Sequence, residues 1–558
     1  MNLFETIFNP ESLNRTAILY EQRRIRYAEL RDETLAVATV LSELGVTRGE
    51  RVALLLNDSP EFVACFVAIC SSGAIAVPIN MALQLDEQRA ILNNCTASVA
   101  IAEADLHQLL LAHAPDTLAH LKQVVVVSRE EKFTTEEHGE GGDEEAKARE
   151  IWSFEELMSQ AKVTAARMST LPVSKAQGPL PETAFVEPGE NQPAFILYTS
   201  GSTGEPKGAV HRQSDIFYTN ETYCREVLRL RDGDRLFSSS RLPFAYGLGN
   251  SFTFPLLNGC TTILCREKPS PEVIACVFAD YKPTIFFAVP VIYRLLLDNQ
   301  KSHKTASALD SSSLRLCVSA GEALPAAIGE EWEKTFGVPV LDGIGSTEML
   351  HMWMSNHEGD VVHGSSGKLL RGYQAQLLDP EGQLTPAGTE GNLWVRGASA
   401  AIEYWQRPET TARTFVDGWV RTGDLYRQDT DGYWFHMGRS DDCFKSSGQW
   451  VSPVEVEGAL LRHKSVSRAG VVEDFDEAGL PCACAFVVRT DEARDDLDLE
   501  QTLRELARAA LPRHKQPRRY VFVDELPYTA TGKIQRFKLR ERLREKTLSN
   551  ESGSERFI

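Results

Sequence analysis

The chain has 558 residues, of which 42% are hydrophobic and 25% charged, so it has the composition of an ordinary soluble protein with at least two domains. Its formal net charge of −19 disfavours a nucleic-acid-binding surface and suits a small-molecule enzyme, although acidity that only maintains solubility is the simpler interpretation. No run approaches the roughly 18 apolar residues of a membrane span, so we expect no membrane partner.

The first residues and the cysteines predict a cytoplasmic protein. Residues 1–15 lack the basic start and apolar stretch of a secretion signal. The eleven cysteines are scattered without C-x-x-C spacing, and no histidine cluster accompanies the nearest pair, Cys482 and Cys484. This pattern disfavours a zinc site and favours reduced thiols.

Buried strands and helices alternate from the start of the chain to about residue 370. Residues 51–57 predict a strand, and the next helix begins at the N-cap Ser59 and closes at Gly73. A second strand at 74–80 completes a β-α-β unit, which implies parallel strands with helices on the faces of the sheet. Further strand-like runs occur near residues 123, 194, 261, 284 and 314. We therefore predict a large α/β region.

The pattern changes twice towards the C-terminus. Residues 373–437 consist of short alternating strands split by Gly and Asp turns, which predicts an antiparallel β subdomain. After residue 438, mixed helices and strands predict a small α+β domain, in which Leu499, Leu503 and Leu506 share one helical face. We therefore divide the chain into a large domain, 1–437, and a small domain, 438–558. The acidic segment 129–150 is interpreted as a solvated, potentially disordered insertion.

One loop has the composition of a phosphate site. The stretch "LYTSGSTGEPKGAVH" (197–211) fails the spacing of a Walker A loop and of a dinucleotide fingerprint. Its glycines nevertheless allow backbone N–H groups to converge on an anion, while hydroxyls and a lysine surround them. The residues concerned are Thr199, Ser200, Gly201, Ser202, Thr203, Gly204, Lys207 and Gly208. A Gly/Ser-rich surface turn is the alternative, which the preceding buried strand and the fixed lysine spacing disfavour.

"YTSGSTGEPKG" resembles the signature loop of the adenylate-forming superfamily, which comprises acyl-CoA synthetases, peptide-synthetase adenylation domains and firefly-type luciferases. Four more motifs follow in the family's order: "GIGSTEM" (343–349), "RTGDL" (421–425), "GRSDDCFKSSGQWVSP" (438–453) and "YTATGKIQR" (528–536). Within the superfamily, "PFAYGLGNSF" (243–252) and "GIGSTEMLHMWMSN" (343–356) resemble the benzoate-CoA ligase group. The resemblance implies a large N-terminal domain of mostly parallel sheets with flanking helices and a β subdomain, and a small mobile C-terminal α+β domain.

The resemblance also implies a reaction in two steps. ATP first converts a carboxylate into acyl-AMP and pyrophosphate, and a thiol such as that of CoA then displaces AMP. Positive charge around the α-phosphate must stabilise the attack of one anion on another. The family assigns the β- and γ-phosphates to Thr199, Ser200, Thr203 and Lys207. It places Thr347 near the α-phosphate and Mg²⁺ on Glu348, a residue that would be read alone as a solvent-facing acid.

The remaining motifs are assigned by the same resemblance. Asp424 with Arg439 would bind the ribose, although alone they would be turn residues. Lys533, an ordinary solvated lysine without its motif, would be the catalytic cation of the first step. Gly321, Glu322 and Asp342 would line the adenine. Asp441 would be the hinge of the small domain, and Gly448 would face the incoming pantetheine.

The acid is expected to be a small aryl carboxylate. Amino-acid-activating relatives place an aspartate where this chain has "PFAYGLGN", which contains no acid. Phe244, Ala245 and Tyr246 instead suggest a compact pocket suited to a flat ring. The benzoate-ligase resemblance surrounds the ring with Ala245, Tyr246, Gly345, His351 and Met352. His351 is expected as a donor near the carboxylate, whereas a lone histidine is ordinarily a core or surface residue. We expect a monomer or homodimer.

Three other functions are weighed against a CoA ligase. The acceptor thiol could belong to the phosphopantetheine of a separate carrier protein instead of CoA. A regulatory nucleotide-binding protein without catalysis is disfavoured because Lys533, Glu348 and Asp424 are all present. Nothing in the sequence favours an oxidative luciferase.

Overall fold

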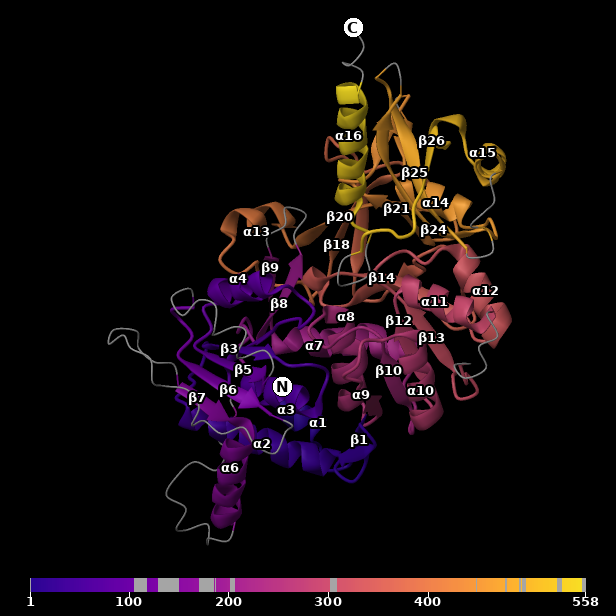
Figure 1. The fold of residues 1–558 in the computed structure, drawn as a ribbon. Helices are drawn as coiled ribbons and strands as arrows, with labels where there is room; N and C mark the ends of the chain where they lie inside the picture. Colours follow the sequence, from indigo (N-terminus) through magenta and orange to yellow (C-terminus); the bar gives the residue numbers. More distant parts are fainter. Residues whose placement is uncertain are drawn as a thin grey trace.

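The computed structural model describes residues 2–104, 118–128, 150–169, 185, 187–200, 206–301, 309–447, 449–476, 479–490, 493, 498–528 and 534–553. A large N-terminal body carries a smaller C-terminal one, from which the last helix projects (Figure 1). Of the acidic segment 129–150, all but Glu150 lies outside the described residues.

Seven strands form the first sheet, in the order β7-β6-β5-β3-β4-β8-β9. Its strands are β3 (Arg51–Leu55), β4 (Ile75–Pro78), β5 (Val99–Glu103), β6 (Gln123–Val127), β7 (Glu150–Ser153), β8 (Phe195–Ser200) and β9 (Pro206–His211). All pairs are parallel except the hairpin of β8 and β9. The predicted β-α-β unit is confirmed, because β3 and β4 are parallel neighbours joined by α3 (Pro60–Ser71), which Ser59 caps.

Helix α3 is buried in the largest core cluster of the described residues. Its apolar residues leave no polar face, as expected for a helix that is buried all round. The Phe66 ring lies 5.4 Å from Phe195 of the first sheet and 5.3 Å from Phe252 of the helical segment beside the second sheet. The other helices of this region are α1 (Leu3–Ile7), α2 (Tyr27–Glu43), α4 (Leu85–Cys95) and α6 (Phe154–Ser169).

Nine strands form the second sheet, in the order β16-β15-β14-β13-β12-β10-β11-β1-β2. They are β1 (Thr16–Tyr20), β2 (Arg23–Arg26), β10 (Arg235–Ser238), β11 (Thr261–Ile263), β12 (Ile285–Ala288), β13 (Leu316–Ser319), β14 (Val340–Gly345), β15 (Met352–Ser355) and β16 (Lys368–Leu369). The pairs from β1 to β14 are parallel, and antiparallel strands complete both ends. The carboxyl ends of β13 and β14 therefore carry adjacent loops, where ligands of open α/β sheets bind.

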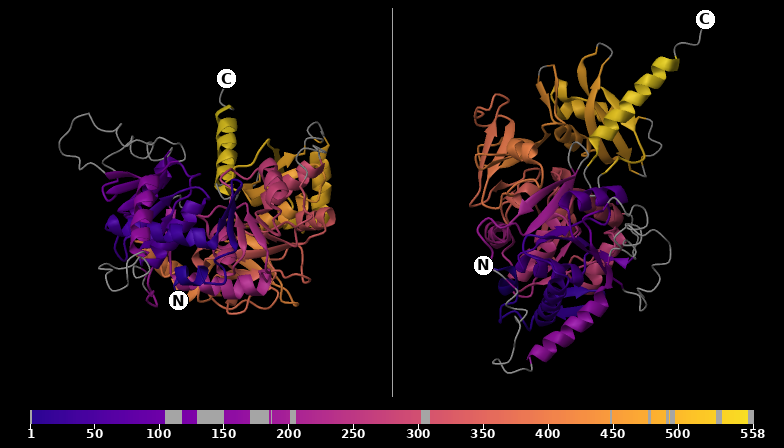
Figure 2. Two further views of the ribbon diagram at one scale, coloured as in Figure 1. Left: turned by 90° about the horizontal axis from the view of Figure 1, so that it is seen from below. Right: turned by 90° about the vertical axis from the view of Figure 1, so that its left-hand side faces the viewer.

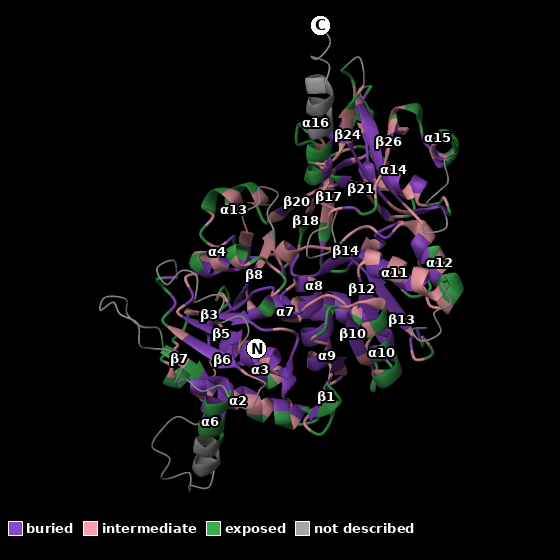
Figure 3. Cartoon of the chain, viewed as in Figure 1, coloured by how far each residue is buried: buried purple, intermediate pink, exposed green. Residues whose placement is uncertain are grey.

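Helices precede or follow most strands of the second sheet along the chain. They are α7 (Gln213–Thr219), η4 (Asn220–Leu228), α8 (Ala245–Leu248), η5 (Gly249–Thr253), α9 (Phe254–Leu257), α10 (Pro271–Tyr281), α11 (Pro290–Lys301), α12 (Ala326–Phe336) and the short η7 (Thr347–Met349). Buried residues are concentrated in the strands and in the helices between the sheets, whereas α10, α12 and α13 (Pro408–Thr414) expose residues to solvent (Figure 3).

The predicted antiparallel region is confirmed as a five-stranded sheet. Its strands are β17 (Gln374–Leu378), β18 (Gly391–Arg396), β19 (Phe415–Val416), β20 (Trp419–Gln428) and β21 (Trp434–Arg439). Strand β20 pairs with β18, β19 and β21, always antiparallel. This sheet places the "RTGDL" motif opposite the start of the "GRSDD" motif.

The small domain has its own sheet and core. Its elements are β22 (Phe444–Ser446), β23 (Gln449–Val451), α14 (Pro453–Leu460), β24 (Val466–Phe475), β25 (Pro481–Arg489), α15 (Leu499–Ala510), η9 (Arg513–Lys515), β26 (Arg519–Phe522) and α16 (Arg536–Gly553). Leu499 and Leu503 are buried in its core and Leu506 packs at the edge. The expected architecture of a large α/β domain with a small α+β domain is confirmed (Figure 2), while the boundary at 437/438 stays a prediction.

Candidate active site

The predicted phosphate loop connects β8 to β9, which pair as an antiparallel hairpin. Thr199 pairs with Lys207 and Ser200 with Pro206, so the strands hold the two ends of the loop together. Gly201, Ser202, Thr203 and Gly204 lie outside the described residues, as does the side chain of Ser200. Gly208 belongs to β9 and not to the loop: a Cβ there would lie 2.7 Å from Ile196 and 2.9 Å from the Tyr198 ring, so close packing requires glycine.

Tyr404 brings Lys207 and Glu348 to one place. Its hydroxyl donates a 2.6 Å hydrogen bond to Oε1 of Glu348, and the Nζ atom of Lys207 lies 5.9 Å from the centre of its ring. The backbone N–H of Ala401 also donates to the carbonyl of Glu348, at 2.8 Å. Sequence analysis did not identify Tyr404, because no local pattern links it to residues 56 and 197 positions earlier.

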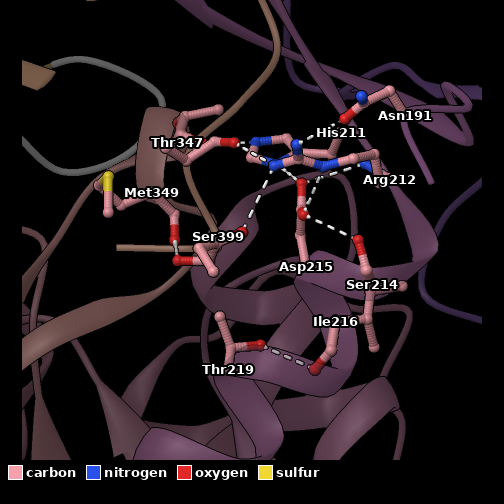
Figure 4. A network of polar contacts seen from close by, with 12 residues as sticks. Asn191, His211, Arg212, Ser214, Asp215, Ile216, Thr219, Thr347, Met349 and Ser399 are labelled. Atoms are coloured by element: carbon pink, nitrogen blue, oxygen red, sulfur yellow. Dashed lines mark hydrogen bonds and ion pairs between the residues drawn. The ribbon is translucent and has the colours of Figure 1, made fainter. Parts of the chain in front are cut away.

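A buried polar network lies beneath Thr347 (Figure 4). His211, at the end of β9, contacts Asp215 through Nδ1 at 3.0 Å and the carbonyl oxygen of Thr347 through Nε2 at 2.8 Å. Arg212 donates to Asp215 at 2.8 Å and to the carbonyl of Ala400 at 2.6 Å. One feature of the sequence could have identified His211: in a strand, Lys207 and His211 point to the same face, because side chains alternate between faces.

Asp424 and Arg439 face each other across β20 and β21. The Nη1 atom of Arg439 lies 3.2 Å from Oδ1 of Asp424 and donates to the carbonyl of Thr422 at 2.8 Å. Nε2 of His436, which sequence analysis did not single out, lies 3.4 Å from the same carboxylate. Gly423 adopts a φ of +75°, and a Cβ there would lie 2.7 Å from Arg439, so this approach requires glycine.

The proposed adenine wall meets the small domain. Glu322 accepts a 3.1 Å hydrogen bond from the backbone N–H of Ile534. Lys533 lies outside the described residues, but Tyr528 and Ile534 form a β-bridge that closes its loop. The residue next to Lys533 therefore lies against the loop after β13.

Asp342 is a buried carboxyl group at this wall. One oxygen accepts from the backbone N–H of Leu324 at 3.2 Å, and Oδ1 has no partner among the described residues. Burial raises the pKa of Asp342 to about 8, despite the hydrogen bond from Leu324. Gly321 turns the chain beside it with a φ of +93°.

Aromatic rings surround His351 at the expected acid pocket. The imidazole lies 4.7 Å from the Tyr223 ring and 4.8 Å from Phe254, and Tyr246 stacks beside it at 5.8 Å. Burial lowers the pKa of His351 to about 3, so the ring is neutral, and neither nitrogen has a partner among the described residues.

The backbone of the pocket is closely packed. Gly345 pairs with Met352 across β14 and β15, and a Cβ at Gly345 would lie 2.7 Å from the carbonyl of His351. Tyr246 packs on the core of the second sheet, whereas Ala245 packs on the core around α3. Phe244 is half-buried and precedes α8.

The expected hinge lies between two anchored segments. Before it, Ser440 donates its backbone N–H to the carbonyl of Gly423 at 2.9 Å. After it, Asp442 pairs with Arg540 at 2.9 Å and with Arg536 at 3.6 Å, both on α16. Asp441 stands between these anchors, and Gly448 lies outside the described residues.

Comparison with known proteins agrees with this architecture. Residues 7–405 match the family described as AMP-binding enzyme, and residues 455–533 match its C-terminal domain. A benzoate–CoA ligase of Thauera aromatica is 39% identical over 501 residues, covering 89% of this chain and 86% of the relative. A 4-hydroxybenzoate–CoA/benzoate–CoA ligase of Rhodopseudomonas palustris is 35% identical over 528 residues, covering 94% and 90%.

Solved structures resemble the whole chain. An anthranilate CoA ligase in complex with anthranoyl-AMP superposes with a TM-score of 0.85 at 35% identity, covering 98% of each chain. A benzoate CoA ligase from Burkholderia xenovorans superposes with a TM-score of 0.81 at 34% identity, covering 97% of this chain and 100% of the other. The chain therefore belongs to the AMP-binding enzyme family and is an adenylate-forming, AMP-releasing acid–thiol ligase.

Proposed function

We propose that this ligase activates a small aryl carboxylate with ATP and transfers it to CoA. The carboxylate oxygen attacks the α-phosphate, which forms aryl-AMP and releases pyrophosphate. The CoA sulfur then attacks the acyl carbon, and the C–O bond to AMP breaks to give aryl-CoA and AMP. The observation that supports this proposal most is that Tyr404 contacts both Glu348 and Lys207, which brings residues of two distant motifs together.

The nucleotide would lie between three groups of residues. Thr199, Lys207 and the loop between them would bind the β- and γ-phosphates, and Thr347 would contact the α-phosphate. The Asp424 carboxylate would accept hydrogen bonds from the ribose hydroxyls, as only a carboxylate can for two donors at once. Gly321, Glu322 and Asp342 would line the adenine.

Glu348 fits the role of a magnesium ligand. Tyr404 occupies Oε1 with a single hydrogen bond, and one carboxylate combined with phosphate oxygens is the donor set that Mg²⁺ prefers. No cluster of three or more His, Cys, Asp or Glu that could hold a metal ion occurs in the described part of the chain. When bound, Mg²⁺ would neutralise charge on the departing pyrophosphate.

Lys533 would supply the mobile positive charge of the first step. The hydrogen bond between the Ile534 N–H and Glu322 supports this role, because Glu322 is one of the residues proposed to line the adenine. An ammonium group there would stabilise the negative charge that accumulates as the carboxylate attacks phosphorus. Rotation about Asp441 would then remove it and admit the pantetheine thiol past Gly448.

The acid pocket favours a flat apolar ring. Tyr246, Met352 and the neutral His351 would line it; Tyr246 stacks on His351, and aromatic side chains stack well on an aryl ring. A neutral imidazole can donate one hydrogen bond to a carboxylate oxygen without pairing to it as a cation. The substrate class is therefore benzoate or a ring-substituted benzoate.

CoA is favoured over a carrier protein as the acceptor. The relatives named above are CoA ligases and match this chain over most of their length. A p-hydroxybenzoic acid–AMP ligase of Mycobacterium tuberculosis is 31% identical, and this chain covers 65% of its length.

We propose a cytoplasmic location for the protein. None of its eleven cysteines forms a disulfide, as expected in a reducing compartment. Among the described residues no helix combines the length and apolarity needed to cross a bilayer.

Mass spectrometry of reactions with ATP, CoA and a panel of aryl and alicyclic acids tests the proposal. We expect aryl-CoA and AMP with benzoate or a substituted benzoate, and little product with α-amino acids. Aryl-AMP without aryl-CoA, with transfer only to a carrier protein, would overturn the assignment of CoA. No acid-dependent pyrophosphate release from any aryl acid would overturn the substrate class.

A further inference from the structure

His211 lies fully buried between the phosphate hairpin and the Thr347–Glu348 segment (Figure 4). Its ring stacks on Phe195 with centroids 5.3 Å apart and an interplanar angle of 18°. Its two nitrogens face Asp215 and the carbonyl oxygen of Thr347. The imidazole therefore joins the end of β9 to η7, 136 residues later in the chain.

The hydrogen-bond chemistry fixes one proton of this ring. A carbonyl oxygen can only accept, so Nε2 must carry the hydrogen and donate it to Thr347. Asp215 takes the contact on the opposite nitrogen, and it is itself held by Arg212 through Nε at 2.8 Å and the backbone N–H at 3.0 Å. The carboxylate thus orients the imidazole and keeps the Nε2 donor directed at Thr347.

The contact with Thr347 orients a peptide group of the active site. Because the peptide between Thr347 and Glu348 is planar and trans, its N–H points away from His211 when its carbonyl points toward it. The next carbonyl, that of Glu348, accepts from Ala401, and the carboxylate accepts from Tyr404. Arg212 donates to the carbonyl of Ala400, the residue before Ala401, and so holds the segment that contacts Glu348.

We propose that His211 is a positioning residue for adenylation, which sets the plane of the Thr347–Glu348 peptide, and that Asp215 holds it in the required orientation. Neither residue contacts substrate in this account. The inference rests on the proposed roles of Thr347 at the α-phosphate and of Glu348 at Mg²⁺.

Two substitutions of His211 separate its two contacts. In His211→Gln the side-chain amide reaches the place of Nε2 and can still donate to Thr347, while the contact with Asp215 is lost. In His211→Asn the amide reaches the place of Nδ1, so Asp215 keeps its partner and Thr347 loses its donor. Both variants remove the ring from Phe195 and their side chains differ by one methylene, so thermal unfolding is measured to separate the loss of packing from the loss of the donor. Ser214→Ala, which removes a part-buried 3.3 Å contact with Asp215 but leaves both contacts of Arg212 with that carboxylate, serves as a control remote from Thr347.

Acid-dependent ATP–pyrophosphate exchange is measured for each variant, together with thermal unfolding and peptide-level hydrogen exchange over residues 346–350. We expect kcat of His211→Asn to lie about tenfold or more below that of His211→Gln at similar melting temperatures, because displacement of a reacting group is costly. Hydrogen exchange in 346–350 should be faster in His211→Asn than in His211→Gln. Ser214→Ala should behave as wild type.

Equal kcat and equal exchange in the two His211 variants would overturn the inference and leave only a packing role for the ring. Absence of pyrophosphate exchange in the wild type with every acid would instead count against the proposed substrate class. The hydrogen-exchange comparison needs no substrate, so it decides the inference in that case as well.

Discussion

The hydroxyl of Tyr404 donates a 2.6 Å hydrogen bond to the carboxylate of Glu348, while the ring of the same tyrosine lies under the ammonium group of Lys207. The buried side chain of Tyr404 thus brings together the Glu348 carboxylate and the Lys207 ammonium group, which belong to motifs more than 130 residues apart. Burial, followed by the charge of Glu348, raises the pKa of Tyr404, so the phenol stays protonated and remains a donor at physiological pH.

Tyr404→Phe should weaken adenylation while keeping the ring beneath Lys207. Loss of the hydrogen bond frees the Glu348 carboxylate to adopt other rotamers, so we expect kcat for pyrophosphate exchange to fall about tenfold. The free energy of unfolding should fall by about 1 kcal/mol. Tyr404→Leu, which also removes the aromatic face, should raise the KM for ATP further. Exchange kinetics indistinguishable from wild type in Tyr404→Phe would contradict this role.

Lys533→Ala should abolish aryl-AMP formation and leave thioester formation from supplied aryl-AMP largely intact, because the ammonium group acts only while the carboxylate attacks phosphorus. Each half-reaction is measured separately by product formation. Lys538→Ala, on the exposed part of α16 five residues later, is the matched control and should retain both steps. A similar loss of both half-reactions in Lys533→Ala would refute the assignment.

Asp441→Pro should permit adenylation and block thioester formation, because proline restricts the backbone torsion about which the small domain would turn. Asp441→Ala removes the same carboxylate but leaves the torsion free, so it should retain both steps. Single-turnover measurements of aryl-AMP and aryl-CoA distinguish the variants. An unimpaired second step in the proline variant would show that no rotation about this residue is needed.

Asp342 should make the protein less stable as pH rises. Its pKa is raised to about 8 in the folded state, chiefly by burial, against about 3.9 when unfolded. Between these values the folded state binds the extra proton, so the free energy of unfolding contributed by this group falls as pH increases from about 4 to 8. Asp342→Asn cannot titrate. Its melting temperature relative to wild type should therefore rise from pH 5.5 to 8, and a constant difference would contradict the raised pKa.

The sequence predicted those parts of the fold that depend on neighbouring residues. The cap at Ser59, the parallel unit around α3 and the antiparallel strands of 373–437 all follow from local periodicity and turn residues. The antiparallel return of β9 on β8 could not be read in this way, because the apolar run of β8 does not specify the direction of its partner.

Sequence analysis also predicted only part of the candidate site. Motifs identified Lys207, Glu348 and Asp424, since their neighbours carry the family pattern. Sequence analysis did not identify Tyr404 or Asp215, because their contacts form only when segments distant in sequence pack together. His436 lies beside Asp424 because of the register between β20 and β21, and no local sequence pattern determines that register.

A crystal structure of the enzyme with an aryl-AMP formed from a substrate acid would show where the nucleotide and the acid bind. We expect the ribose hydroxyls on the Asp424 carboxylate, the phosphate beside Thr347 and the aryl ring against Tyr246 and His351. An aryl-AMP bound away from both Asp424 and Thr347 would contradict this expectation.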